Sequence, residues 1–202
     1  MSTKGRLVES AKKLIAERGY NNTKVEDITN EAQVAKGTFY TYFKTKEDIF
    51  IEILDNIFQK AETALKELQF EKDLKKDLHK FISFMYRGAF NDRGPFKIIS
   101  NIFTNPELMT KVILLAPKGE LFKRVIQNIL IDCRDEVWEE VYSKFDYVLS
   151  SLDEMIKVYM GNIFGMDETC CIKLDEIDKV SEKDLESHIN FLTEFLYRAL
   201  RK

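Results

Sequence analysis

The sequence predicts an all-α fold, and three observations carry that prediction. Apolar residues recur at spacings of three and four along nearly the whole chain, which is the period of a helix with one buried face. Strand-like alternation is absent, and Gly (8 residues) and Pro (3 residues) are scarce among the 202 residues. With 45% hydrophobic residues, the chain can form one large core or two small ones that share a helix.

The first two helices are defined by their ends. An apolar stripe marks the first helix, which ends at Gly19, because glycine readily adopts the left-handed turn that terminates helices. Thr23 and Glu26 have the spacing of a capping box, so a second, short helix is expected to begin at Thr23 and run to Ala32.

Two further helices follow after short turns. The third spans about residues 36–43, and Thr45 with Asp48 marks the capped start of a fourth. The stripe of the fourth helix continues to Leu68, so this helix is expected to join two domains. Short helices joined by a tight turn and braced on both sides form the helix-turn-helix layout. We therefore predict one domain at residues 1–50 and a second at residues 51–202.

The second domain is predicted to be a helical bundle. Its expected helices are at residues 73–91, 95–104, 106–115, 121–145, 147–164 and 182–201. Segment 121–145 carries one unbroken apolar stripe, as expected for the central helix of a bundle. In the last helix, apolar residues step by four, three, four and three from Leu185 to Ala199, which is a seam for packing another helix.

Composition argues against a secreted or membrane protein. No apolar run approaches the roughly 18 residues that cross a bilayer, and the N-terminus lacks the pattern of a secretory signal, so we expect a cytoplasmic protein. Cys133, Cys170 and Cys171 do not form an even disulfide framework. We expect free or buried thiols there, with a redox role for the last two left open. The two histidines, His79 and His188, stand apart, so no metal site and no cofactor are predicted.

Charge is distributed unevenly along the chain. The net charge is −3, yet residues 1–50 carry nine Lys or Arg and seven Asp or Glu, and the remainder carries the acidic excess. If a nucleic acid is bound, the first quarter of the chain is the part expected to bind it.

Segment 36–46 combines a buried face with a polar one. Phe39 and Phe43 are four residues apart and are expected to face inward. On the opposite side, hydroxyl and ammonium groups suit phosphate oxygens and base edges. These groups belong to Lys36, Thr38, Tyr40, Thr41, Tyr42 and Lys46.

This segment closely resembles the recognition helix of the TetR family of bacterial repressors. The string Lys-Gly-x-Phe-Tyr-x-Tyr-Phe-x-x-Lys at residues 36–46 carries the resemblance, which extends over about residues 6–50. It implies that phosphates are bound by Tyr40, Tyr42 and Lys46, and that the major groove is read from Lys36, Gly37, Thr38 and Thr41. Thr23 is explained as an N-cap that can also touch a phosphate.

Two residues depart from the family pattern. Gln33 stands where the family usually has a turn glycine, so a non-glycine residue is expected to adopt a positive φ. Ala35 replaces the usual serine, so the third helix is expected to lack a side-chain cap and one phosphate contact. Neither change removes the motif.

The resemblance also implies a dimer and a ligand cavity. The helices at 147–164 and 182–201 would form a four-helix homodimer interface, with Gly161 permitting close approach and Phe191 and Phe195 beside the seam. Large groups available to line an inducer cavity are Phe81, Phe84, Met85, Phe103, Trp138 and Tyr142, with Tyr86 and Asn101 as further polar candidates. Each could equally be an ordinary core residue. If the cavity exists, its lining favours a small lipophilic or aromatic ligand.

Three hypotheses of function follow. The preferred one is a repressor that binds a palindromic DNA operator as a homodimer and is released by an inducer, with recognition helices about 34 Å apart. The second is a TetR-like DNA-binding protein without an inducer, in an architectural or division-linked role. The third, an enzyme, is disfavoured because the sequence has no phosphate-binding glycine loop, metal cluster or nucleophile elbow.

Overall fold

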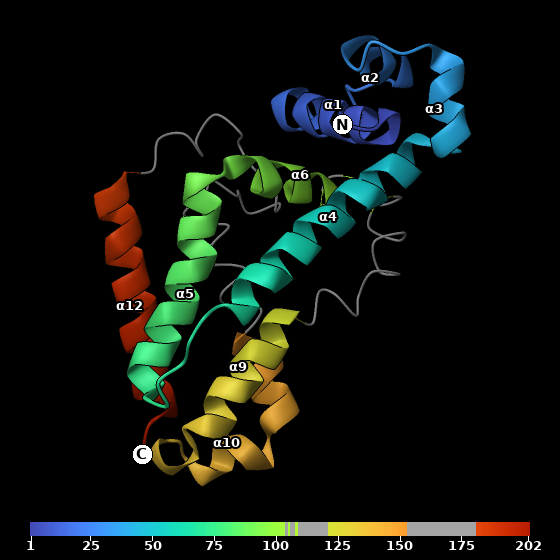
Figure 1. Ribbon diagram of the computed structural model, residues 1–202. Helices are drawn as coiled ribbons and strands as arrows, with labels where there is room; N and C mark the ends of the chain where they lie inside the picture. Colours follow the sequence, from blue (N-terminus) through green and yellow to red (C-terminus); the bar gives the residue numbers. More distant parts are fainter. Residues whose placement is uncertain (104, 106–107, 109–120, 153–180) are drawn as a thin grey trace. The chain divides into compact units, whose positions relative to one another are not determined.

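The computed structural model describes residues 1–103, 105, 108, 121–152 and 181–202 (Figure 1). Every regular element of this part is a helix, which confirms the all-α prediction. The chain forms two compact units. The first consists of Met1–Thr63 and Asp92–Ala116, and the second consists of Ala64–Asn91 and Pro117–Lys202. Among the described residues, no helix has the length and apolar character needed to span a bilayer.

The first unit contains the N-terminal helices together with one later helix. Its helices are α1 (Thr3–Arg18), α2 (Val25–Glu31), α3 (Lys36–Tyr42), α4 (Lys46–Lys66, whose last three residues belong to the second unit) and α6 (Arg93–Phe103). Its core includes Phe39 of α3 and the following Phe43, both buried as predicted, together with Ile98 of α6. Segment 92–103 therefore packs with the helix-turn-helix, although more than 40 residues separate it from α3.

The ends of α1 and α4 follow the sequence signals. Gly19 has φ +84° and its N–H donates to the Ile15 carbonyl, so it ends α1 as predicted. At the start of α4, the Asp48 N–H donates to the Thr45 hydroxyl, and the Thr45 N–H donates to the Asp48 carboxylate at 2.9 Å. This reciprocal pair is a capping box.

The start of α2 was predicted wrongly. Its N-cap is Lys24, whose N–H donates to the Asp27 carboxylate at 2.9 Å. Thr23 is fully buried instead, and its hydroxyl donates to the Gly19 carbonyl at 2.9 Å. Because a threonine hydroxyl can bond locally to the backbone on either side, the spacing to Glu26 could not show which helix end it serves.

Gln33 adopts the left-handed conformation expected of it, with φ +54°. Its N–H donates to the Asn30 carbonyl at 3.1 Å, and the N–H of Val34 donates to the Thr29 carbonyl at 3.0 Å. These two bonds form a Schellman motif, the helix ending that normally places glycine at this position. A side chain with a Cβ is therefore strained here, in an exposed turn.

Gln33→Gly is expected to stabilise the protein by about 0.5–1 kcal/mol, because relief of left-handed strain outweighs the greater freedom of glycine in the unfolded chain. The melting temperature should rise by roughly 1–4 °C, measured by calorimetry. Gln33→Ala is the control, since it removes the side chain and keeps the strain. Equal stabilisation by both substitutions would contradict a backbone origin.

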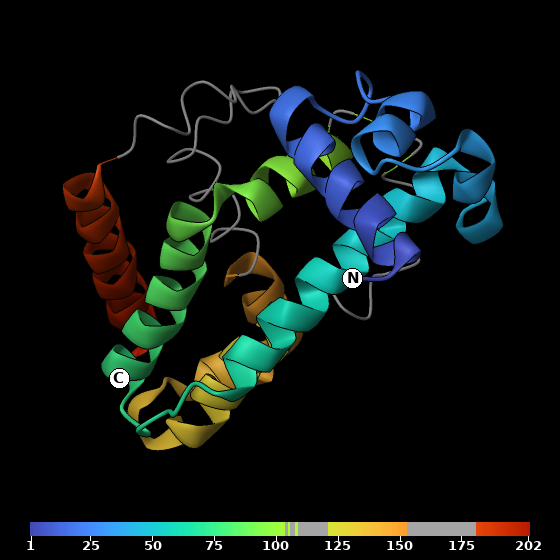
Figure 2. The same cartoon turned by 45° about the horizontal axis from the view of Figure 1, so that its top comes forward.

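The second unit is built around α5 (Leu74–Asn91). It also contains α9 (Leu121–Asp132), the 3₁₀ turn η2 (Arg134–Glu136), α10 (Glu139–Ser143) and α12 (Glu182–Leu200). Helix α12 lies alongside α5 (Figures 1 and 2) and buries Leu185, Ile189 and Leu192 of the predicted seam. Ala199, the last member of that seam, is exposed instead.

The predicted continuous helix at 121–145 is wrong, because the chain breaks between α9 and α10. Val137 is extended (φ −101°, ψ 141°) and forms an antiparallel bridge with Arg201. The Trp138 N–H donates to the Leu200 carbonyl at 3.0 Å, and the Lys202 N–H donates to the Glu136 carbonyl at 2.9 Å. The C-terminal residues thus supply the backbone partners that a continuous helix would supply along its own axis.

Cys133, at this break, is 3% exposed, and its Sγ lies 3.9 Å from the carboxylate of the buried Asp77. Burial, reinforced by the Asp77 charge, raises the pKa of the thiol to about 12. Because the thiolate is the reactive form, native Cys133 should resist Ellman's reagent at pH 8, whereas the unfolded chain should react at once. The measurement uses the Cys170→Ser, Cys171→Ser double variant, and rapid labelling of its native form would contradict this prediction.

Candidate nucleic-acid interface

Helix α3 buries one face and exposes the other. Phe39 is fully buried and Phe43 is 5% exposed, whereas Tyr40 and Tyr42 are 52% and 45% exposed. The Phe39 ring meets the Tyr40 ring edge-on, with 5.4 Å between centroids, so Tyr40 is supported at its base while its outer part stays accessible. Helix α3 begins after Ala35 without a side-chain cap, as predicted.

Gly37, in the first turn of α3, is exposed, and a Cβ built there would meet no heavy atom within 4 Å. Packing within the protein therefore gives no reason for a glycine at this position, although glycine weakens a helix by about 1 kcal/mol relative to alanine. The Thr41 hydroxyl donates to the Gly37 carbonyl at 3.3 Å, so Thr41 faces outward on the same side. Open space above Gly37 suits close approach of another surface.

Lys36 forms an ion pair with Glu26, which the sequence had placed in a capping box. The hydrogen bond between them lowers the pKa of Glu26 and raises the pKa of Lys36, so both are ionised at neutral pH. Because both side chains are exposed, the pair is weak, and a phosphate or base can compete for the ammonium.

Lys46 faces inward rather than outward. Its Nζ donates to the carbonyls of Tyr20 at 2.9 Å and Thr23 at 3.0 Å, and lies 3.9 Å from the centroid of the Tyr20 ring. Burial lowers its pKa, because the ammonium has exchanged part of its hydration for these carbonyls and the ring. Lys46 thus ties the start of α4 to the turn between α1 and α2.

Tyr20 and Asn101 were missed as part of this region. The Tyr20 N–H donates to Asn101 Oδ1 at 2.8 Å, and the Tyr20 hydroxyl donates to the Glu47 carboxylate at 2.8 Å. The sequence had placed Asn101 in a ligand cavity. The only signal for Tyr20 was its place within residues 6–50, over which the family resemblance extends, and no local pattern connects Tyr20 to Asn101.

The six candidates for a ligand cavity lie in four different places. On α5, Phe81 is buried, and Phe84 and Met85 are half-buried. Trp138 is 49% exposed at the break after η2, so it does not line an enclosed cavity. Phe103 is the last residue of α6, and its side chain lies outside the described part of the structure. Gly161, predicted at the dimer interface, also lies outside the described residues.

Tyr142, the sixth candidate, contacts Leu130 of α9 and the nearby Phe145. Its hydroxyl donates to the Leu130 carbonyl at 2.5 Å, and its ring stacks on Phe145. Burial raises the pKa of its hydroxyl. Tyr142 therefore joins α10 to α9, and its polar group is already engaged.

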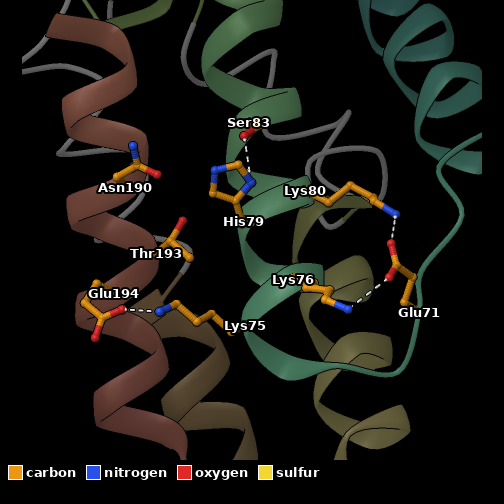
Figure 3. Close-up of a pocket in the computed structure, with 9 residues that line it drawn as sticks. All are labelled: Glu71, Lys75, Lys76, His79, Lys80, Ser83, Asn190, Thr193 and Glu194. Atoms are coloured by element: carbon orange, nitrogen blue, oxygen red, sulfur yellow. Dashed lines mark hydrogen bonds and ion pairs between the residues drawn. The ribbon is translucent and has the colours of Figure 1, made fainter. Parts of the chain in front are cut away.

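A groove of about 790 Å³ opens between α5 and α12 (Figure 3). Charged and polar side chains line it: Glu71, Lys75, Lys76, His79, Lys80, Ser83, Asn190, Thr193 and Glu194. Ion pairs cross or border it, with Lys75 Nζ 2.6 Å from Glu194 and Lys80 Nζ 3.0 Å from Glu71. None of the six predicted ligand residues lines this groove, so it is not the cavity that the sequence predicts.

Comparison with known proteins connects the N-terminal region to a family. Residues 7–53 match the family described as bacterial regulatory proteins, tetR family. The uncharacterised HTH-type transcriptional regulator YhgD of Bacillus subtilis strain 168 is 34% identical over 172 residues, which cover 80% of this chain and 83% of YhgD. YuxN, another uncharacterised HTH-type regulator of that strain, is 36% identical over 67 residues, but the match covers only 23% of YuxN.

Solved structures share the fold over the whole chain. A putative transcriptional regulator from Saccharomonospora viridis, solved in complex with choline, has a TM-score of 0.73 with 18% sequence identity. The match covers 98% of this chain and 97% of that one. The similarity therefore extends beyond the N-terminal helices to the helical bundle.

Proposed function

The chain belongs to the TetR family of bacterial regulatory proteins, and from this we propose that it is a ligand-responsive repressor that binds palindromic operator DNA as a homodimer. TetR-family regulators bind DNA, act as dimers, and are transcriptional regulators rather than enzymes. Its site of action would be the cytoplasm, where operator DNA is accessible.

The observation that carries the proposal is the exposed face of α3. The phenol groups of Tyr40 and Tyr42 are accessible, and the opposite face of the helix is buried in the core. Phenol hydroxyls and ammonium groups suit phosphate oxygens, and a helix of this kind enters a major groove. We assign phosphate contacts to Tyr40 and Tyr42.

Base recognition is assigned to the first turn of α3 and the residues next to it on the same face. These residues are Lys36, Gly37, Thr38 and Thr41, with Gly37 leaving room for the helix backbone to approach the bases. Thr23 and Lys46, predicted as phosphate contacts, are assigned instead to holding the helix-turn-helix together. Their polar groups bind backbone carbonyls.

Dimerisation is assigned to the exposed ridge of α12, which faces away from the residues buried against α5. Ser187, Phe191, Phe195 and Ala199 follow one another at four-residue intervals and are all exposed. The two phenylalanine rings stack at 6.3 Å between centroids and are about half accessible. Large aromatics flanked by small residues are typical of a helix that packs against another helix. The partner helix in this interface is predicted at residues 147–164, of which the structure describes only residues 147–152.

Release by a small lipophilic or aromatic inducer is the finer part of the proposal. It is supported by the aromatic and sulfur side chains of α5, namely Phe81, Phe84 and Met85. The choline complex of the Saccharomonospora viridis regulator is a precedent for a small molecule bound within this fold. The second candidate, a DNA-binding regulator without a lipophilic inducer, is supported by the groove between α5 and α12, which none of the six candidate residues lines.

The experiment that tests operator binding is selection of duplexes from a random library, followed by fluorescence-anisotropy titration at two salt concentrations. We expect a palindromic consensus and a dissociation constant that rises steeply with salt. Tyr42→Phe should weaken binding to every duplex alike, whereas Thr38→Val should change the preferred sequence. Failure of the wild type to select any sequence would refute the proposal. A thermal-shift screen of lipophilic and aromatic compounds, with loss of operator binding as the second readout, separates the two candidates.

A further inference from the structure

The geometry points to Asn101 on α6 as a positioning residue for operator recognition, one that fixes the turn between α1 and α2 and, through that turn, the start of α4. This inference rests on the proposed function. It concerns a residue outside the helix-turn-helix motif, in a segment that sequence analysis assigned to ligand binding.

Both ends of the Asn101 amide are engaged, which fixes its orientation. Its Nδ2 donates to the Lys97 carbonyl at 2.7 Å within α6, so its Oδ1 faces away from α6 and accepts the Tyr20 N–H at 2.8 Å. Tyr20 follows the end of α1 and is only 4% exposed. A buried backbone donor needs an acceptor, and Asn101 supplies one from 81 positions along the chain.

Gly19 shows how closely Asn101 approaches the turn. Asn101 Oδ1 would lie 3.4 Å from a Cβ added at Gly19, whose φ of +84° already disfavours a side chain. In the same unit, Ile98 and Leu108 are fully buried in the core that α1 also lines. Helix α6 therefore reaches the turn through the Asn101 hydrogen bond and packs against α1, beside which Figure 2 shows it.

The other groups of Tyr20 bind α4. Its carbonyl accepts from Lys46 Nζ at 2.9 Å, and its hydroxyl donates to Glu47 at 2.8 Å. Its ring meets Phe50 edge-on at 5.1 Å. Tyr20 thus connects Asn101 with Lys46, Glu47 and Phe50 in the first two turns of α4.

The start of α4 matters because α3 has only seven residues and is separated from α4 by a turn of three. Such a short helix is not stable alone, so the position of α3 depends on the helices it packs against. Base contacts require the two recognition helices of a dimer to match successive major grooves, whereas phosphate attraction tolerates displacement. Loss of the Asn101 contact should therefore reduce specific binding far more than non-specific binding.

The test uses the full-length protein and two fluorescent duplexes: the one that the wild type selects from a random library, and a scrambled duplex of the same composition. Asn101→Ala should weaken binding to the selected duplex about tenfold and to the scrambled duplex less than about twofold, with an unchanged salt slope. Amide exchange at Tyr20 should become faster. Asn101→Asp keeps an acceptor for the Tyr20 N–H but loses the donor to the Lys97 carbonyl, so it should restore part of the slow exchange and part of the selectivity.

The matched control is Asn105→Ala. Asn105 Nδ2 reaches the same turn at Asn21 Oδ1, 3.1 Å away, through an exposed contact between side chains, and its Oδ1 accepts the Leu108 N–H at 3.2 Å, away from the turn. This variant should bind both duplexes like the wild type. If Asn101→Ala keeps the wild-type selectivity, or loses both affinities in parallel with its melting temperature, the positioning role is refuted. A wild type that selects no duplex would instead refute the proposed function itself.

Discussion

Replacing Phe191 and Phe195 together by aspartate will convert the protein from dimer to monomer and weaken operator binding at least about a hundredfold. The loss is large because a dimer binds two half-sites at once, and linkage of two weak sites multiplies affinity by roughly 10²–10⁴. Both rings are about half exposed in the isolated chain, so burying two carboxylates there opposes association rather than folding. Sedimentation velocity and anisotropy titration provide the two readouts.

The control for this result is Ile131→Asp on α9, where another large apolar side chain is 50% exposed. It should leave the sedimentation coefficient and the operator affinity unchanged. A double variant that remains dimeric would show that the exposed ridge of α12 is not the interface. A monomer that retains full operator affinity would show that dimerisation is not needed for binding.

Lys46→Met will destabilise the protein by about 1–2 kcal/mol, because the Tyr20 and Thr23 carbonyls lose their shared donor. The melting temperature should fall by roughly 2–8 °C. Operator affinity should fall with it, since the start of α4 is released, but the slope of log affinity against log salt should stay the same. If Lys46 instead bound a phosphate directly, that slope would decrease by about one.

Lys44→Met is the matched control, because it removes the same charge from an exposed position two residues earlier. Its melting temperature should not change, since surface substitutions of this kind usually alter stability by less than about 0.5 kcal/mol. A variant of Lys46 that keeps the wild-type melting temperature while losing salt dependence would restore the phosphate assignment made from the sequence.

Local patterns predicted most helix ends of the first unit, although not the start of α2. The pair Thr45 and Asp48 was expected to cap α4 and does so, and Gln33 was expected to adopt a positive φ and does so. Phe39 and Phe43 were expected to face inward and are buried. These features depend on interactions within about four residues, which periodicity and capping patterns describe directly.

The break between α9 and α10 could not be predicted from such patterns. Segment 121–145 contains neither glycine nor proline, and its apolar stripe continues through the break. The hydrogen bonds that replace the helix come from residues 200–202, at the other end of the unit. The break depends on backbone partners that lie more than 60 positions away in the sequence, which no local pattern in the segment indicates.

By itself, the sequence determined the all-α class, the position of helix α3 and the exposure of Tyr40 and Tyr42, because each depends on near neighbours and on a specific motif. Only the tertiary structure decided that Lys46 binds the Tyr20 and Thr23 carbonyls, that Glu26 pairs with Lys36, and that α6 joins the DNA-binding unit through Asn101. A charged or amide side chain takes whichever partner the fold brings within about 3 Å. For these residues the partner lies 10 to 81 positions away, beyond the range of any local pattern.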